Sequence, residues 1–63
     1  MVSTYQITVM GVAVNDWMAL RKLAFNSAQP IGETYGGQVG TFTFDQPVTP
    51  ADLGPLVRIE LIS

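Results

Sequence analysis

The chain contains neither cysteine nor histidine, and for 63 residues this is the feature that most restricts how a fold can be stabilised. A domain of about 60 residues buries only about 60% of the surface that its unfolded chain exposes. Domains this small are usually stabilised by disulfides, by a bound metal or by association. Disulfides need cysteine, and structural zinc is held by cysteine and histidine. We therefore expect residues 1–63 to form one domain that is stabilised by association.

Charged residues are few, and they restrict the class of partner. The chain has 3 Lys and Arg residues against 5 Asp and Glu residues, for a formal net charge of -2. Nucleic-acid binding neutralises several phosphates with Lys and Arg together, and here only Arg21 and Lys22 are adjacent. The acidic residues are scattered, which disfavours an acidic mimic of a phosphate backbone. We expect no nucleic-acid partner.

The longest apolar stretch, residues 7–14, is too short to cross a membrane. A membrane-spanning helix needs about 20 apolar residues, roughly twice this length. A secretory signal would begin with positive residues, and the first basic residue is Arg21. We therefore expect no membrane partner and a cytoplasmic location, with which the lack of cysteine is consistent.

Three segments alternate apolar and polar side chains with the period of a half-buried strand: residues 5–10, 38–45 and 56–63. In the second of these, Phe42 and Phe44 lie on one face and threonines on the other, so we expect the Phe face to be core. After residue 10 the first segment loses its polar side. That change indicates one of two things: a bulge at Gly11, or a strand that continues to Val14 and is covered on both faces in its second half.

Residues 17–26 are predicted to form the main helix, because they hold no Gly or Pro and follow two good N-cap residues, Asn15 and Asp16. At 100° per residue, one broad stripe is expected to pack on the sheet: Trp17, Leu20, Leu23 and Ala24. Met18 and Phe25 lie seven residues apart on a second stripe. A three-stranded sheet covers only one side of a helix, so this second stripe is expected to be free for another contact.

Two more segments complete the predicted fold. Residues 26–37, which contain Pro30 and three glycines, are typical of a loop. Residues 49–52 resemble a helix start, with Thr49 as N-cap and Pro50 at the first helical position, and Gly54 ends this turn. The order β-α-β-short helical turn-β predicts an α+β domain with one helix on a three-stranded, mostly antiparallel sheet.

The pairing of the predicted strands is only partly determined. About 10 residues separate the last two strands, too few for a parallel crossover, so they are expected to be antiparallel if they are neighbours. The direction of the first strand stays open. None of the three strands carries a Lys or an internal Pro, the residues that usually protect a sheet edge from pairing with another chain.

Catalytic chemistry has little support in the sequence. Without His or Cys, the commonest general base and the thiolate nucleophile are missing. Asp45 and Asp52 are close in sequence, but a capping role explains Asp52. The sequence has no Asp-rich loop of the kind that binds calcium. We expect no catalytic residue, no metal and no cofactor.

One Gly-rich segment, residues 32–40, is the candidate for a small-molecule site. Main-chain N–H groups of such loops can hold an anion, and an aromatic ring can stack on a ligand. The candidate ligand-binding residues are Glu33, Tyr35, Gly36 and Gly37. Nucleotide-binding motifs place their glycines between a strand and the following helix, whereas these precede a strand. Turn glycines are therefore the favoured interpretation of this segment.

The second helix stripe is the candidate protein interface. Interface centres are enriched in aromatic residues, Met and Arg. The candidate interface residues are Met18, Arg21, Lys22 and Phe25. The alternative is that residues 28–37 fold back over these side chains through Ile31.

Two functional hypotheses follow. The first is a non-enzymatic protein-interaction module that assembles into a homo-oligomer, with another protein as a further partner. The second is a small inhibitor or sequestering protein, of the kind that viruses encode, which binds a host protein or a nucleotide-like ligand. Small size and the lack of catalytic groups are the only support for the second hypothesis.

Overall fold

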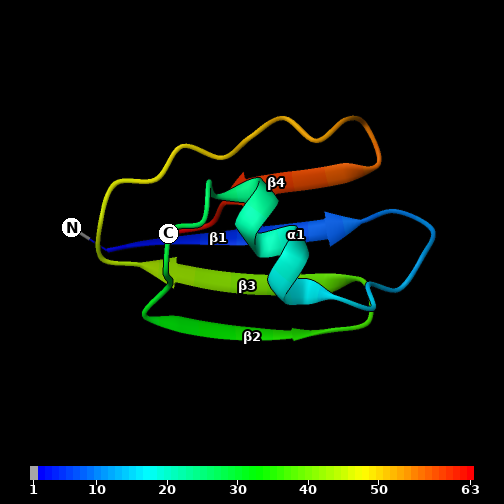
Figure 1. The fold of residues 1–63 in the computed structure, drawn as a ribbon, viewed down its shortest axis with the longest axis horizontal. Helices are drawn as coiled ribbons and strands as arrows, with labels where there is room; N and C mark the ends of the chain where they lie inside the picture. Colours follow the sequence, from blue (N-terminus) through cyan, green and yellow to red (C-terminus); the bar gives the residue numbers. More distant parts are fainter. Residues whose placement is uncertain (1) are drawn as a thin grey trace.

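A computed structural model describes residues 2–63 of the chain. The α+β class is confirmed, because one helix lies across one face of an antiparallel sheet (Figure 1). The elements are β1 (Ser3–Val9), α1 (Trp17–Ala24), β2 (Gly32–Gly36), β3 (Val39–Phe44) and β4 (Val57–Leu61). Within residues 2–63 the sheet has four strands in the order β2-β3-β1-β4, one more than the sequence predicted.

Strand β1 lies inside the sheet and is antiparallel to both of its neighbours, β3 and β4. Its residue Ile7 faces Gly40 of β3 on one side and Ile59 of β4 on the other. This register settles the direction of the first strand, which the sequence left open. The last two strands, β3 and β4, are separated by β1 and are not neighbours.

Strand β2 corrects the prediction that residues 26–37 form a loop. It pairs antiparallel with β3, and Gly36 at its end lies opposite Val39. Gly37 and Gln38 form the connecting turn, and Gly37 has a φ of 61°. A two-residue hairpin turn with a glycine of positive φ at its first position is a favoured way to join two antiparallel strands.

Helix α1 starts where the sequence predicts and ends earlier. Oδ1 of Asp16 accepts a hydrogen bond from the N–H of Ala19 at 3.1 Å, which confirms Asp16 as the N-cap. The helix ends at Ala24. Shortly after it, Asn26 and Ser27 adopt the left-handed conformation, with φ of 54° and 64°, which a right-handed helix cannot continue through. The N–H of Ser27 then donates to the carbonyl oxygen of Lys22 at 2.9 Å, as in a Schellman motif.

The expected helix start at residues 49–52 is wrong, because the polar groups there form other hydrogen bonds. The N–H of Ala51 donates to the last carbonyl oxygen of α1, that of Ala24, at 2.8 Å. Oδ1 of Asp52 accepts from the N–H of Gly54 at 3.0 Å, which closes a local turn. This segment is therefore an irregular connection that satisfies the C-terminal end of α1.

Strand β1 ends at Val9, before the end that the alternation of apolar and polar side chains predicts. Gly11 has a φ of 84°, and the chain turns there and leaves the sheet. The N–H of Val14 donates to the carbonyl oxygen of Gly37 at 2.8 Å, so this connection rests on the β2–β3 turn. Residues up to Val14 are thus a loop, and the proposal of a doubly covered strand is wrong.

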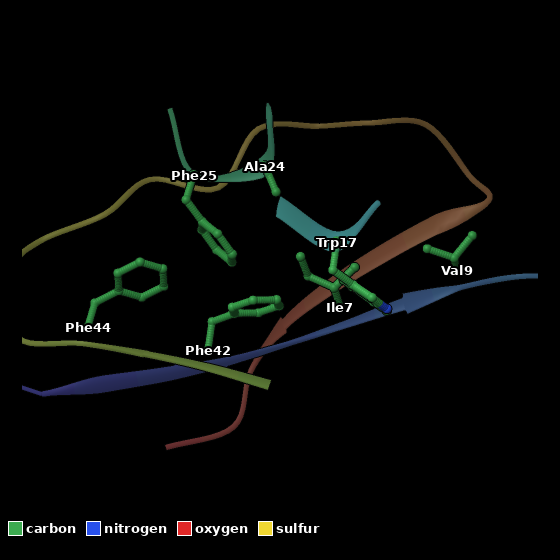
Figure 2. Close-up of a cluster of buried hydrophobic side chains, with 7 residues drawn as sticks. All are labelled: Ile7, Val9, Trp17, Ala24, Phe25, Phe42 and Phe44. Atoms are coloured by element: carbon green, nitrogen blue, oxygen red, sulfur yellow. The ribbon is translucent and has the colours of Figure 1, made fainter. Parts of the chain in front are cut away.

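The core lies between α1 and the sheet (Figure 2). Its buried residues are Ile7, Val9, Trp17, Ala24, Phe25, Phe42 and Phe44. Phe42 and Phe44 are fully buried, which confirms the predicted core face of their strand. The rings of Phe25 and Phe44 are the closest aromatic pair, with centroids 4.7 Å apart.

Candidate functional site

The four predicted interface residues do not share one surface. Met18 and Lys22 are exposed, whereas Arg21 and Phe25 keep only 3% and 1% of their surface accessible. The expectation that Met18 and Phe25 form one free stripe is therefore wrong. Of the pair, only Met18, at 56% exposed, is open to a partner.

Phe25 is buried because it follows the last residue of α1 and no longer obeys the helical projection. Its φ and ψ are -120° and 23°, outside helical values. Its ring packs against those of Tyr5 and Phe42 as well as Phe44, with centroids 5.6 and 5.8 Å away for the first two. Leu23 is the converse case: the helical projection predicts it on the packed stripe, whereas its side chain is 65% exposed.

Arg21 is buried because the segment that follows α1 and the side chain of Glu33 in β2 cover its guanidinium group. Its Nη1 donates to the carbonyl oxygen of Ala28 at 2.8 Å, and its Nε lies 4.0 Å from Oε1 of Glu33 in β2. The segment 28–37 therefore covers Arg21, whereas the alternative in which it covers Met18 and Phe25 through Ile31 is wrong. The covering residues are Ala28 and Glu33, whereas Ile31 is 58% exposed.

The predicted ligand loop is a β-hairpin. Glu33, Tyr35 and Gly36 belong to β2, and Gly37 belongs to the turn. The ring centroid of Tyr35 lies 5.7 Å from that of Trp17. Glu33 and Tyr35 are thus placed beside α1 by the pairing of β2, and ligand binding by this segment stays a prediction.

The free edge of β2 is the surface feature that stands out. All five residues of β2 are exposed, and within residues 2–63 the strand pairs with β3 alone. The five residues, GETYG, include no Lys and no Pro. An edge of this kind presents unpaired N–H and C=O groups to which another strand can bind.

The opposite edge, β4, is better protected. Val57 and Ile59 are half-buried, and the connection from β3 runs beside this strand (Figure 1). A cavity of about 310 Å³ separates the two and is lined by Pro50, Ala51, Asp52, Leu53, Val57 and Ile59. The strand also carries two charged residues, Arg58 and Glu60, whereas β2 carries one, Glu33, and charged side chains disfavour pairing with another chain. The β2 edge is therefore the more accessible of the two.

Other places in the described part of the chain offer fewer functional groups. A second cavity, of about 270 Å³, is lined by Ser3, Tyr5, Gln46, Pro47 and Val48. Across residues 2–63, no three Asp or Glu side chains gather where a metal ion would need them. The only helix in this range is also too short to span a membrane.

Comparisons of the chain with protein families, with curated proteins and with solved structures found no match. The function is therefore inferred from the surface of the molecule. A partial sequence signal for the β2–β3 hairpin did exist: Gly37 and Gln38 directly precede the clear strand, and a glycine-containing turn of two residues is typical of a hairpin. The five residues of β2 do not alternate apolar and polar side chains, so the strand itself carried little signal.

Proposed function

We propose that this chain is a non-enzymatic protein-interaction module that assembles into a homo-oligomer. The observation that carries the proposal is the free edge of β2, whose five residues are all exposed. Its main-chain groups can extend the sheet by pairing with a strand from a second copy. Such pairing needs no charged side chains, which suits a chain with only 13% charged residues.

Apolar side chains near this edge support the same proposal. Tyr35 lies in β2 and is 48% exposed, and Ile31, directly before β2, is 58% exposed. Met18 follows Trp17, whose ring neighbours that of Tyr35, and is also exposed. Single exposed apolar residues are normal on a surface, but Ile31 and Tyr35 lie on or next to the open edge strand, where a paired strand would cover them.

The proposal is tested by the mass of the folded chain over a dilution series. Sedimentation or light scattering from about 1 mM down to about 1 μM covers association free energies from about -4 to about -8 kcal/mol. We expect a mass above the 6.8 kDa of one chain at the highest concentration, decreasing on dilution. A folded species that stays at 6.8 kDa at about 1 mM would contradict the proposal.

The same edge can also pair with a strand from a different protein. A small inhibitor or sequestering protein, the second hypothesis, would bind its partner in this way. Strand addition to a sheet edge is a common mode of peptide recognition. A chain that is monomeric by itself but forms a defined complex with a second protein, lost when the β2 edge is blocked, would favour this alternative over self-assembly.

A further inference from the structure

We infer that two copies of this chain pair antiparallel along β2, with Thr34 of one copy directly opposite Thr34 of the other. This inference rests on the proposed self-association and adds the edge, the direction and the register. The product is one continuous eight-stranded sheet with both helices on the same face. Hydrogen-bonding geometry, charge and exposure along β2 support it.

The hairpin determines which main-chain groups of β2 are free. Gly36 and Val39 flank the two-residue turn, so they form a pair that exchanges hydrogen bonds. Hydrogen-bonded pairs alternate along an antiparallel ladder, which directs the main chain of Thr34 toward β3 as well. The N–H and C=O groups of Glu33 and Tyr35 therefore point away from β3, along the free edge.

Three symmetric registers would use these free groups, and two of them are poor. Centring the pair on Glu33 places two carboxylates opposite each other, and like charges in that position destabilise a sheet. Centring it on Tyr35 leaves Glu33 opposite Gly37 of the partner, which lies in the turn. Only one hydrogen-bonded pair would then lie within the two β2 strands.

The third register, centred on Thr34, satisfies every free group. Glu33 lies opposite Tyr35 of the second copy, and Tyr35 lies opposite its Glu33, so both form hydrogen-bonded pairs. The two carboxylates are kept apart, each beside an uncharged ring. Thr34 lies opposite Thr41, which alternates with the buried Phe42, so the two Thr34 side chains meet on the face away from α1.

The size of this contact predicts a weak dimer. Stable protein pairs bury about 800 Å² per partner, which is about a fifth of the 3976 Å² surface of this chain. Five paired residues with Ile31 beside them bury less than that. We therefore expect a weak dimer, populated mainly toward the upper end of a series from about 1 μM to about 1 mM.

Disulfide trapping tests the register, because the chain has no cysteine of its own. Across a pair that is not hydrogen-bonded, two α-carbons lie about 4.5 Å apart, within the range that a disulfide bridges. In the proposed dimer the variant Thr34→Cys places its two thiols in such a pair. Gly36→Cys is the matched control: it is exposed on the same face of the same strand, and a Cβ there meets no atom within 4 Å.

In the proposed register the two Cys side chains of the control lie four positions apart, about 13 Å along the strands. At about 0.5 mM under mild oxidation, we expect Thr34→Cys to form covalent dimer about tenfold faster than Gly36→Cys. Equal rates, in a chain whose unsubstituted form does dimerise, would overturn the register and leave self-association standing. A strictly monomeric unsubstituted chain would overturn both.

Amide hydrogen exchange on the unsubstituted chain decides the question if a cysteine variant fails to fold. On raising the concentration from about 10 μM to about 1 mM, the N–H groups of Glu33 and Tyr35 should exchange more slowly. The N–H of Thr34, already directed toward β3, should change little. Dimerisation without slower exchange at Glu33 and Tyr35 would overturn pairing along β2.

Discussion

The indole ring of Trp17 covers Gly40 so closely that no side chain fits between them. A Cβ atom at Gly40 would lie 2.7 Å from Cζ3 of Trp17 and 2.8 Å from Cε1 of Phe42. Gly40 lies in β3 opposite Ile7, at the position where the start of α1 crosses the sheet. The missing side chain is therefore what allows the helix to approach the sheet at this point.

Replacing Gly40 by Ala should destabilise the fold. Both neighbouring atoms belong to rigid rings, so the added methyl group displaces α1 or Phe42, and overpacking of this kind costs about 1–3 kcal/mol. The matched control is Gly32→Ala, also in a strand, where a Cβ meets nothing within 4 Å. Urea unfolding should show a lower midpoint for Gly40→Ala alone, and equal midpoints for the two variants would contradict the close packing.

Truncation of Phe25 should destabilise the fold more than truncation of Leu23. The helical projection predicts the opposite, because it places Leu23 on the packed stripe and Phe25 on the free one. Phe25→Ala removes a ring that is 1% exposed, and such changes cost about 3–5 kcal/mol. Domains have only about 0.05–0.15 kcal/mol of stability per residue, so much of this variant should be unfolded by circular dichroism. Leu23→Ala, at a 65% exposed site, should stay within about 0.5 kcal/mol of the parent. Equal urea midpoints for Phe25→Ala and Leu23→Ala would contradict the burial of Phe25.

Elements with a strong local signal could be predicted from the sequence. The Phe face of β3 is set by strict alternation, and Asp16 caps α1 because a carboxylate that precedes an uninterrupted helical run accepts a free N–H. Strand β2 lacks a signal of that strength. Its five residues are all exposed and two of them are glycines, so it depends on pairing with β3 rather than on burial of its own side chains.

The burial of Arg21 at the predicted interface has the same origin, whereas Phe25 is buried because it departs from the helical conformation. A helix face is buried or exposed according to what lies beneath it, and the sequence was interpreted with a three-stranded sheet. With β2 present, Glu33 lies beside the guanidinium group of Arg21 and helps to cover it. The periodicity of the helix gave the correct position for Trp17 and Ala24, which are both buried.

Arg21 should contribute to stability mainly through its packing and its bond to Ala28. Arg21→Met keeps most of the side-chain volume but leaves the carbonyl oxygen of Ala28 without its donor, a loss worth about 1–3 kcal/mol. Glu33→Gln should cost only about 0–1 kcal/mol, because the side chain of Glu33 is 38% exposed and its ion pair is screened by water. Urea unfolding of both variants at low and high salt measures the difference. A larger loss for Glu33→Gln would make the ion pair the dominant contact.

Ser27→Gly should stabilise the chain, although it removes a side chain. Ser27 has a φ of 64°, a conformation that costs a residue with a Cβ about 1–2 kcal/mol and that glycine adopts freely. Glycine loses about 0.5–1 kcal/mol through its greater freedom in the unfolded chain, so the net gain is about 0–1.5 kcal/mol. The residue is exposed, and its N–H bond to Lys22 is retained because the substitution leaves the main chain unchanged.

Ser3→Gly is the matched control, the same chemical change in the extended conformation of β1, where it should cost about 0.5–1 kcal/mol. Thermal unfolding should move the two midpoints in opposite directions, and a lower midpoint for Ser27→Gly would contradict a strained end of α1.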